Sequence, residues 1–428
     1  MKNHIIVWMA QGKAAVDLPY WGDIISKKIP ASEYFLPVFS ALFEKYNLPV
    51  WYASEYKSVG SSWSPDEIKS GLHCVYRIIF QQDREIPKGL VEEIKLIPSV
   101  KKVEAIGIGV TDIPQISEPM GFRRNPSETI FLNEAHAFSS GHPDITIAVL
   151  DTGVDHNHSE LSEVLLPGMD FVDILDGADK FIGDYLHLDD EPFDEVGHGT
   201  HVCGILCAKG IKMNKGVVPR CKILPVRVLG SLKKGNALVG AGLKGNINNG
   251  IKWAVDQGVD VINMSLGIKN EGGGLPHEEV IKYALSKGVT IVAASGNDGN
   301  KDLYYPGALP GVIAVGAVDE KDQVAGFSTY GHHVSFVAPG ANIISSFPGN
   351  KYSLSSGTSQ ASPFVAGAIA LLKSYAFNLG VQLKDNQVKY ILKHTADRLD
   401  HRIKDIKSGY GRINLLDAIK LLQFKLSI

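Results

Sequence analysis

The stretch GTSQASPFVAGAIALL, residues 357–372, decides the fold of this chain. Its small and apolar residues predict a helix that packs closely against its neighbours. Ser359 would stand at the amino end of this helix, where the dipole favours negative charge and a backbone N–H could face an oxyanion. A serine hydroxyl is a poor nucleophile at neutral pH. Catalysis would therefore need a base beside it and a carboxylate behind that base.

Two other segments supply an acid and an imidazole. Residues 145–150 form an apolar run that predicts a parallel strand buried on both faces, and Asp151 follows at its carboxyl end. Open α/β sheets place their functional sites at that edge. Gly197 and Gly199 flank His198, and apolar residues follow at helical spacing. His198 is therefore predicted to lie in the first turn of a helix.

The order of the three residues along the chain indicates a catalytic role that no single one of them indicates. Taken alone, an acid after a strand or a serine at a helix start is more often structural than catalytic. Asp151, His198 and Ser359 stand 47 and 161 residues apart, and their order and flanking residues resemble the subtilisin-like serine proteases over about residues 144–417. The resemblance implies that Ser359 is the nucleophile, His198 its base and Asp151 the group that orients the imidazole. Ala361 excludes the Gly-x-Ser-x-Gly elbow of α/β-hydrolases.

The same resemblance implies an oxyanion donor and a peptide-binding surface. A second predicted buried strand, residues 289–294, precedes Asn297, whose side-chain amide would stabilise the oxyanion. Alternatively, Asn297 is a turn residue that tolerates a left-handed backbone. An extended substrate would add to the surface as an edge strand. The implied substrate-binding residues are Ser265, Leu266, Gly267, Ser295, Gly296 and Asp298. Asp298, at the pocket rim, hints at tolerance for a basic side chain.

The pattern of strands and helices predicts two domains, residues 1–117 and 118–428. In the second, strands alternate with helices, which predicts an α/β fold with a parallel sheet and helices on both faces, like that of subtilisin. The first has its own pattern of strands at 5–9, 50–52, 75–80 and 103–110, and of helices at 33–46 and 90–97. The order βαββαβ matches a smaller, ferredoxin-like α+β domain.

Part of the first domain resembles the inhibitory prodomains of subtilisin-like proteases. The resemblance lies in residues 86–104, where a helix ends in Pro98-Ser99-Val100 and runs into a Val-Glu strand. It implies that the N-terminal domain is an intramolecular inhibitor whose carboxyl tail lies in the active-site cleft. The linker 112–125 would then cross the cleft, and autocleavage would fall there. An unrelated accessory domain is the alternative interpretation.

Composition excludes several classes of partner. The formal net charge is −3 and there is no long basic stretch, so we expect no nucleic-acid binding. No apolar run approaches the ~20 residues needed to span a bilayer, so we expect no membrane insertion. The apolar run 5–10 is too short for a secretory signal peptide. Four cysteines agree with a reducing compartment, and we expect a cytoplasmic protein, with leaderless export left open.

The chemistry requires no cofactor, and calcium binding is left open. Many relatives hold an ion with a carboxylate nine residues after the catalytic acid and a loop after the histidine helix. This chain has Glu160 at the first place, and its loop 209–215 carries three lysines and one plausible ligand, Asn214. Positive charge at the rim argues against calcium there. The pattern GxGxxG at residues 240–245 does not directly follow a predicted strand, and we assign it to helix packing.

These patterns favour a serine endopeptidase that works through an acyl-enzyme and is held inactive by its N-terminal domain. Its substrate would be a peptide or a protein. One alternative is a catalytically silent relative that only binds peptides or a partner. Another is a hydrolase of non-peptide acyl groups, which would show esterase activity without cleavage of proteins.

Overall fold

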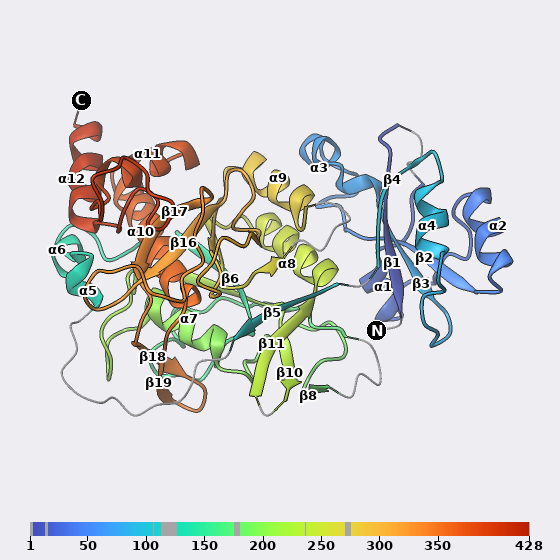
Figure 1. The fold of residues 1–428 in the computed structure, drawn as a ribbon, viewed down its shortest axis with the longest axis horizontal. Coiled ribbons are helices and arrows are strands. Elements are labelled where there is room, and N and C mark those ends of the chain that lie inside the picture. Colours follow the sequence, from blue (N-terminus) through green and yellow to red (C-terminus); the bar gives the residue numbers. More distant parts are fainter. Residues whose placement is uncertain are drawn as a thin grey trace.

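The structure is a computed structural model that describes residues 3–12, 16–105, 107–112, 126–174, 180–235, 237–269 and 275–427. A larger and a smaller body lie side by side along the long axis (Figure 1). The smaller body holds the N-terminal sheet, and the C-terminal helices lie at the opposite end of the molecule.

A seven-stranded sheet forms the centre of the larger body, and its paired neighbours are all parallel. The strand order is β17-β16-β14-β12-β6-β9-β7. The strands are β6 (Thr146–Asp151), β7 (Met169–Asp170), β9 (Lys222–Arg227), β12 (Val261–Met264), β14 (Thr290–Ala294), β16 (Ile313–Val318) and β17 (Val334–Pro339). Parallel strands need crossover connections, which here place helices on both faces and confirm the predicted fold class.

Side chains alternate between the two faces of the sheet. Along β6, Ile147 and Val149 belong to the core beneath α7 and α10, whereas Ala148 and Leu150 belong to the core beneath α8 and α9. These helices are α7 (His198–Cys207), α8 (Lys244–Asp256), α9 (Glu278–Ser286) and α10 (Thr358–Asn378). Because both faces are covered, the strands are mostly apolar instead of alternating between apolar and polar residues.

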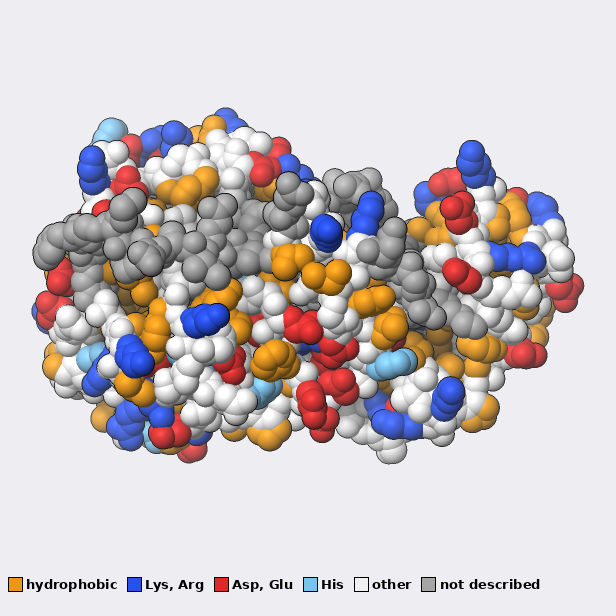
Figure 2. Space-filling model, turned by 90° about the horizontal axis from the view of Figure 1, so that it is seen from below, with side chains coloured by type: hydrophobic (Ala, Val, Ile, Leu, Met, Phe, Trp, Pro, Cys, Tyr) orange, Lys and Arg blue, Asp and Glu red, His pale blue; other side chains and the backbone are white. Residues whose placement is uncertain are grey.

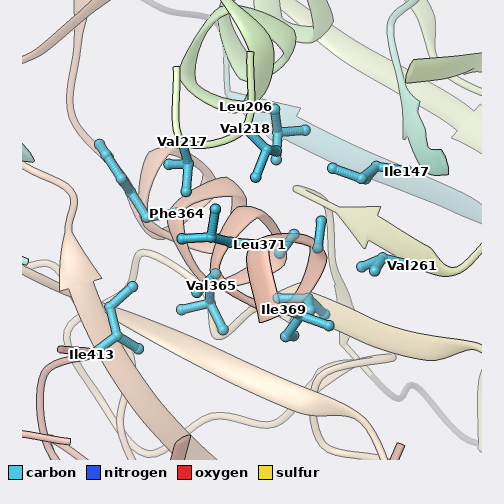
Figure 3. Close-up of a cluster of buried hydrophobic side chains, with 14 of the residues drawn as sticks. Ile147, Leu206, Val217, Val218, Val261, Phe364, Val365, Ile369, Leu371 and Ile413 are labelled. Carbon is cyan, nitrogen blue, oxygen red and sulfur yellow. The ribbon is translucent and has the colours of Figure 1, made fainter. Parts of the chain in front are cut away.

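Helix α10 is the centre of the first core. Phe364, Val365 and Ile369 point outward from different sides of it toward surrounding strands and loops (Figure 3). All of its residues from Thr358 to Ser374 are buried. A helix buried on all sides must lack a polar face, which is why its first charged residue is Lys373. The predicted small-residue helix is confirmed.

The N-terminal sheet has the strand order β2-β3-β1-β4, with every pair antiparallel. Its strands are β1 (His4–Met9), β2 (Val50–Ser54), β3 (Val75–Phe80) and β4 (Val100–Ala105), and helices α2 (Pro37–Lys45) and α4 (Leu90–Lys95) share its core. This confirms the βαββαβ order. Helix α2 begins at Pro37 and not at Glu33, because a residue before proline disfavours the helical conformation and Leu36 is extended, with φ −134°.

The prediction of one strand over residues 103–110 is wrong. The chain forms β4 and then a separate strand, β5 (Ile108–Asp112), which leaves the N-terminal sheet. Strand β5 pairs antiparallel with β11 (Ala237–Leu243) of the larger body (Figure 1). The sheet that contains them has the order β5-β11-β10-β8. A residue pattern can predict a strand without predicting the strand with which it pairs. The change from the N-terminal sheet to the sheet of β11 could therefore not be predicted from the sequence.

The glycine pattern at residues 240–245 also lies elsewhere than we predicted. Gly240 and Gly242 are in strand β11, and helix α8 begins only after them. A Cβ on Gly242 would lie 1.9 Å from the carbonyl oxygen of Val228. The glycine therefore lets β11 approach a neighbouring backbone and does not serve helix packing.

The N-terminal sheet packs on helices α8 and α9 through buried polar contacts as well as apolar ones. Glu67 and Lys252 form an ion pair at 2.8 Å, and both side chains are almost fully buried. Glu279 Oε1 accepts hydrogen bonds from Tyr56 Oη at 2.9 Å and from Trp8 Nε1 at 3.2 Å. Removing one partner of a buried pair leaves an uncompensated charge, so these contacts favour one arrangement of the two bodies.

The remaining elements are short or lie at the surface. They are α1 (Trp21–Ile25), α3 (Pro65–Ser70), η1 (Leu72–Cys74), α5 (Pro126–Thr129), α6 (Leu132–His136), β8 (Phe181–Ile182), β10 (Gly230–Lys234), β13 (Ile268–Lys269), β15 (Tyr304–Tyr305), β18 (Ile343–Phe347), β19 (Lys351–Ser355), α11 (Asp385–Thr395) and α12 (Leu415–Leu426). Acidic and basic side chains are interspersed on the face in Figure 2. Within the described residues, no helix combines the length and apolar character needed to cross a membrane.

Candidate active site

Asp151 and His198 meet at the carboxyl edge of the central sheet. Asp151 is the last residue of β6, and His198 is the first residue of α7, as predicted. His198 Nδ1 lies 2.6 Å from Asp151 Oδ1, and both side chains are buried. A carboxylate can only accept, so Nδ1 carries the proton. The same oxygen accepts a hydrogen bond from the backbone N–H of Thr152 at 2.7 Å, which fixes its orientation.

A second buried carboxylate, which the sequence analysis missed, holds the start of α7. Asp194 accepts hydrogen bonds from the backbone N–H groups of Gly197 at 2.7 Å and Thr200 at 2.8 Å, and from Thr152 Oγ1 at 2.8 Å. Burial raises the pKa of Asp194, and these hydrogen bonds oppose that rise. Asp194 thus links the turn that follows β6 to the helix that carries His198. An acid just before a helix start was the signal that could have revealed it.

The first turn of α7 lies directly against the turn after β6. A Cβ on Gly199 would lie 2.1 Å from the carbonyl oxygen of Gly153, closer than real Cβ contacts come. Gly199 is therefore required for the close approach of the two turns. This approach places the imidazole of His198 beside the carboxylate of Asp151.

Ser359 is the second residue of α10 and lies at the amino end of the helix, as predicted. Its Oγ donates a hydrogen bond to the carbonyl oxygen of Ser265 at 3.0 Å. In return, Ser265 Oγ donates to the carbonyl oxygen of Ser359 at 2.8 Å. These two bonds join the end of β12 to the start of α10. The hydroxyl of Ser359 therefore lies at the same carboxyl edge of the sheet as Asp151.

Asn297 follows β14 and faces the first residue of α10. Its Oδ1 accepts hydrogen bonds from the backbone N–H of Thr358 at 2.8 Å and from Thr358 Oγ1 at 3.0 Å. Two bonds to the amide oxygen hold the side chain in one orientation and direct the amide nitrogen to other acceptors. Asn297 and Ser359 both line the same cavity. The side-chain amide of Asn297 thus lies at the same cavity as the hydroxyl of Ser359.

The cavity at this site has a volume of about 480 Å³. It includes four of the six residues predicted to bind substrate, namely Leu266, Gly267, Gly296 and Asp298. Ser265 and Ser295 are fully buried behind its wall. Ser295 Oγ donates to the carbonyl oxygen of Thr329 at 2.9 Å. These two serines would therefore contribute backbone groups, not side chains, to a substrate.

Asp298 already has partners within the chain. Its Oδ2 lies 2.5 Å from Lys269 Nζ and accepts a hydrogen bond from Tyr304 Oη at 2.7 Å. The hydrogen bond from Lys269 lowers the pKa of Asp298. The carboxylate is thus ionised and balanced by a lysine. This pairing weakens the expectation that Asp298 attracts a basic substrate side chain.

At the position where calcium was left open, Glu160 binds backbone N–H groups. It is fully buried and accepts from Gly210 at 2.8 Å, Ile211 at 3.0 Å and Lys212 at 2.7 Å. Burial opposes its ionisation, but these hydrogen bonds outweigh burial and lower the pKa of Glu160. N–H groups directed at the carboxylate cannot ligate a cation, so the residues do not fit calcium here. Across the described ranges, no group of three His, Cys, Asp or Glu could hold a metal.

We expect Glu160→Gln to lower the melting temperature and Ca²⁺ to leave it unchanged. A neutral amide weakens three charge-assisted bonds and puts its NH₂ group against N–H donors, which costs about 1–3 kcal/mol. Because the folded-state pKa is depressed, the wild-type advantage is present at neutral pH and is lost as the pH falls below about 4.5. Thermal melts in Ca²⁺ and in chelator would measure both effects. A melt raised by Ca²⁺ in the wild type would contradict this role of Glu160.

Comparisons with known proteins show which family this chain belongs to. Residues 142–411 match the model of the Subtilase family. The thermophilic serine proteinase of Bacillus sp. (strain AK1) is 38% identical over 70% of this chain and 67% of that protein. The major intracellular serine protease of Bacillus subtilis (strain 168) is 37% identical over 66% of this chain and 81% of that protein. The solved structure of the prenylagaramide maturation protease PagA superposes with a TM-score of 0.55 at 30% identity, covering 68% of this chain and 98% of the other.

Proposed function

Because this chain belongs to the subtilase family and is a subtilisin-like serine endopeptidase that acts on peptides or proteins, we propose that Asp151, His198 and Ser359 form its catalytic triad. The observation that carries the proposal is the 2.6 Å contact between His198 Nδ1 and Asp151 Oδ1. That contact leaves Nε2, on the other side of the imidazole ring, as the base.

In the proposed reaction, Ser359 Oγ attacks the carbonyl carbon of the scissile bond while His198 Nε2 takes its proton. For this the hydroxyl turns from the carbonyl of Ser265 toward the imidazole. Asn297 Nδ2 and the backbone N–H of Ser359 stabilise the oxyanion. His198 then gives the proton to the leaving amine, and a water molecule hydrolyses the acyl-enzyme by the same steps. Asp151 keeps the imidazole in the required tautomer throughout.

A serine-directed fluorophosphonate probe tests the triad. Its phosphorus forms a bond to Ser359 Oγ as fluoride leaves, and this occurs only if the hydroxyl is activated. We expect a single adduct on Ser359, located by peptide mass spectrometry, together with cleavage of casein. Ser359→Ala is the control and should remain unlabelled. An unlabelled wild-type protein whose N-terminal domain has been clipped off would instead favour the alternative of a silent peptide-binding relative.

We expect Asn297→Ala to lower kcat by about 10²–10³ with little change in KM. The amide contacts the oxyanion only once it has formed, so its loss raises the transition state without weakening substrate binding. Steady-state kinetics on a chromogenic peptide would separate the two parameters. Asn300→Ala, in the exposed loop nearby, is the matched control. An unchanged kcat for Asn297→Ala would show that the oxyanion has other donors.

We also propose that the N-terminal domain inhibits the protease through strand β5. In support, Gly109 and Thr111 of β5 pair with Gly242 and Gly240 of β11, beside the cavity. Thr111 Oγ1 donates to the carbonyl oxygen of Ser265 at 3.1 Å, the same oxygen that accepts from the nucleophile. A substrate that added to this edge as a strand would need the positions that β5 occupies.

Gly109→Phe tests this inhibition. A Cβ on Gly109 would lie 2.9 Å from the side chain of Ile268 and 3.1 Å from that of Ile247, so a large side chain should force β5 out of the cleft. Overpacking of this kind costs about 1–3 kcal/mol, which corresponds to a gain of about 5- to 150-fold in the rate on a short peptide. Gly60→Ala is the control, because a Cβ there makes only an ordinary contact, 3.9 Å from the carbonyl oxygen of Ser62. Equal rates for the two variants would contradict inhibition by β5.

The proposed domain boundary, at residues 117 and 118, and most of the linker proposed for autocleavage lie outside the described residues. Comparing intact masses of the wild type and Ser359→Ala tests autocleavage, since only the wild type should lose the N-terminal domain. We propose a cytoplasmic location. It is supported by four buried free cysteines and by the similarity to a protease named as intracellular.

A further inference from the structure

One aromatic side chain fills the space between the two backbone walls of the predicted substrate pocket. Tyr304 lies on β15, which pairs with β13 immediately after Gly267. A Cβ on Gly267 would lie 3.0 Å from Tyr304 Cδ1, and a Cβ on Gly296 would lie 2.3 Å from Tyr304 Cδ2. The ring is therefore in contact with both glycines. Neither wall could carry a side chain while the ring is there.

Two side chains, Asp298 and Lys269, hold the Tyr304 ring in this position. Its hydroxyl donates to Asp298 Oδ2 at 2.7 Å. Lys269 Nζ lies 5.3 Å from the ring centroid and bridges Asp298 at 2.5 Å and Asp302 at 2.7 Å. Burial raises the pKa of Tyr304 to about 12, with a further contribution from Asp298, so the hydroxyl stays a neutral donor at working pH. Asp298 thus holds the hydroxyl of the ring, and Lys269, which is itself paired with Asp298 and Asp302, holds its face.

We propose that Tyr304 restricts this protease to substrates with a small side chain, Gly, Ala or Ser, on the amino side of the scissile bond. The inference rests on the proposed function and names the substrate class of the same site. In the binding mode that the subtilase resemblance implies, a peptide would pair with residues 265–267, place its carbonyl at Asn297 and direct that side chain between Gly267 and Gly296. The ring already occupies this space, so a Phe or Leu side chain would collide with it.

The volume of the cavity does not oppose this assignment. The residues that line the cavity extend from Gly107 and Ile108, which follow the N-terminal sheet, to Ser359. The space therefore lies along the cleft, where several residues of an extended peptide would fit, and Tyr304 forms part of its wall. To admit a large side chain at the slot itself, the ring would have to leave the hydrogen bond to Asp298 and the contact with Lys269. Both would be lost without replacement.

A competition assay on the full-length chain tests the proposal. Two chromogenic peptides that differ only in Ala or Phe before the scissile bond are mixed, and the ratio of their kcat/KM values is measured. This ratio does not depend on the fraction of molecules whose cleft is open. We expect the wild type to prefer Ala by about tenfold or more, since pocket fit discriminates side chains by about 10–200-fold.

Two variants separate the ring from its hydroxyl. Tyr304→Gly opens the slot and should shift the ratio about 100-fold toward Phe. Tyr304→Phe keeps the ring, loses the hydrogen bonds of the hydroxyl to Asp298 and Lys269 and should keep the preference for Ala. Thermal melts establish that each variant is folded. If Tyr304→Gly does not fold, a wild-type enzyme that shows no preference for Ala still overturns the proposal.

Fluorophosphonate labelling of Ser359 distinguishes the possible failures. A labelled wild-type enzyme that cleaves the Phe peptide as fast as the Ala peptide overturns the assignment of Tyr304 and leaves the triad intact. An enzyme that stays unlabelled and cleaves neither peptide even after its N-terminal domain has been clipped off overturns the proposed function, and the inference falls with it. A preference for Ala that persists unchanged in folded Tyr304→Gly shows that another residue sets the specificity.

Discussion

Ser359→Ala should abolish proteolysis, with kcat falling by about 10⁶, the size known for the corresponding loss in subtilisin. The variant removes the atom that would form the acyl bond, and nothing else in the cavity replaces it. Its backbone should be undisturbed, because Ser265 Oγ bonds to the carbonyl oxygen of Ser359, which the variant retains. Peptide hydrolysis, followed over days at high enzyme concentration, measures the residual rate.

A control on the same helix makes this result specific. Ser374 is buried on α10, and its Oγ donates to the carbonyl oxygen of Ala370 at 2.7 Å, far along the helix from the cavity. Ser374→Ala should keep kcat near the wild-type value while losing a similar buried hydroxyl. Residual turnover by Ser359→Ala within tenfold of the wild type would mean that another group is the nucleophile, and the proposed triad would be wrong.

Asp151→Asn should lower kcat by about 10⁴ while leaving the fold intact. An asparagine can present an N–H to His198 Nδ1, which selects the tautomer that carries its proton on Nε2. That nitrogen can then no longer accept the proton of Ser359. The variant also loses the negative charge that stabilises the imidazolium formed during catalysis. Kinetics from pH 6 to pH 10 would measure the loss, and circular dichroism would establish that the protein is folded.

Asp144→Asn is the matched control for this variant. Asp144 lies just before β6 and is exposed, so the same change in charge occurs at the surface. Exposed charges contribute little, and we expect kcat to stay within about twofold of the wild type. If Asp151→Asn behaves like Asp144→Asn, the contact between Asp151 and His198 is structural only.

The parts of the site that the sequence predicted are those that follow from local rules. Asp151 stands at the end of an apolar run, and His198 and Ser359 each stand at the start of a helix with buried residues beyond. A strand end or a helix start is set by residues close in the chain, so the pattern could locate it. The parallel sheet then brings those ends to one edge, whatever their separation in sequence.

The parts that the sequence did not predict depend on contacts between distant segments. The step from β4 to β5 is a change of partner strand, and no residue within 103–110 records it. The role of Asp194 comes from its hydrogen bonds to Thr152 and to the start of α7, and these contacts form only in the folded protein. The sequence around Tyr304 does not show that its ring lies between Gly267 and Gly296, because neither glycine is next to it in the chain. Each of these roles arises from tertiary packing, which a single sequence reports only weakly.

Strand β5 belongs to the same polypeptide as the edge with which it pairs, and in the proposed inhibition this would fix how it competes with a substrate. A tethered segment meets its binding site at a local concentration of about millimolar or higher, whatever the concentration of the protein in solution. Diluting the intact chain would not expose the cleft, and an incoming peptide must overcome that constant local excess. If the backbone between the two bodies were cut, the same strand would become a separate molecule, and its proposed hold on the cleft would then fall with every dilution.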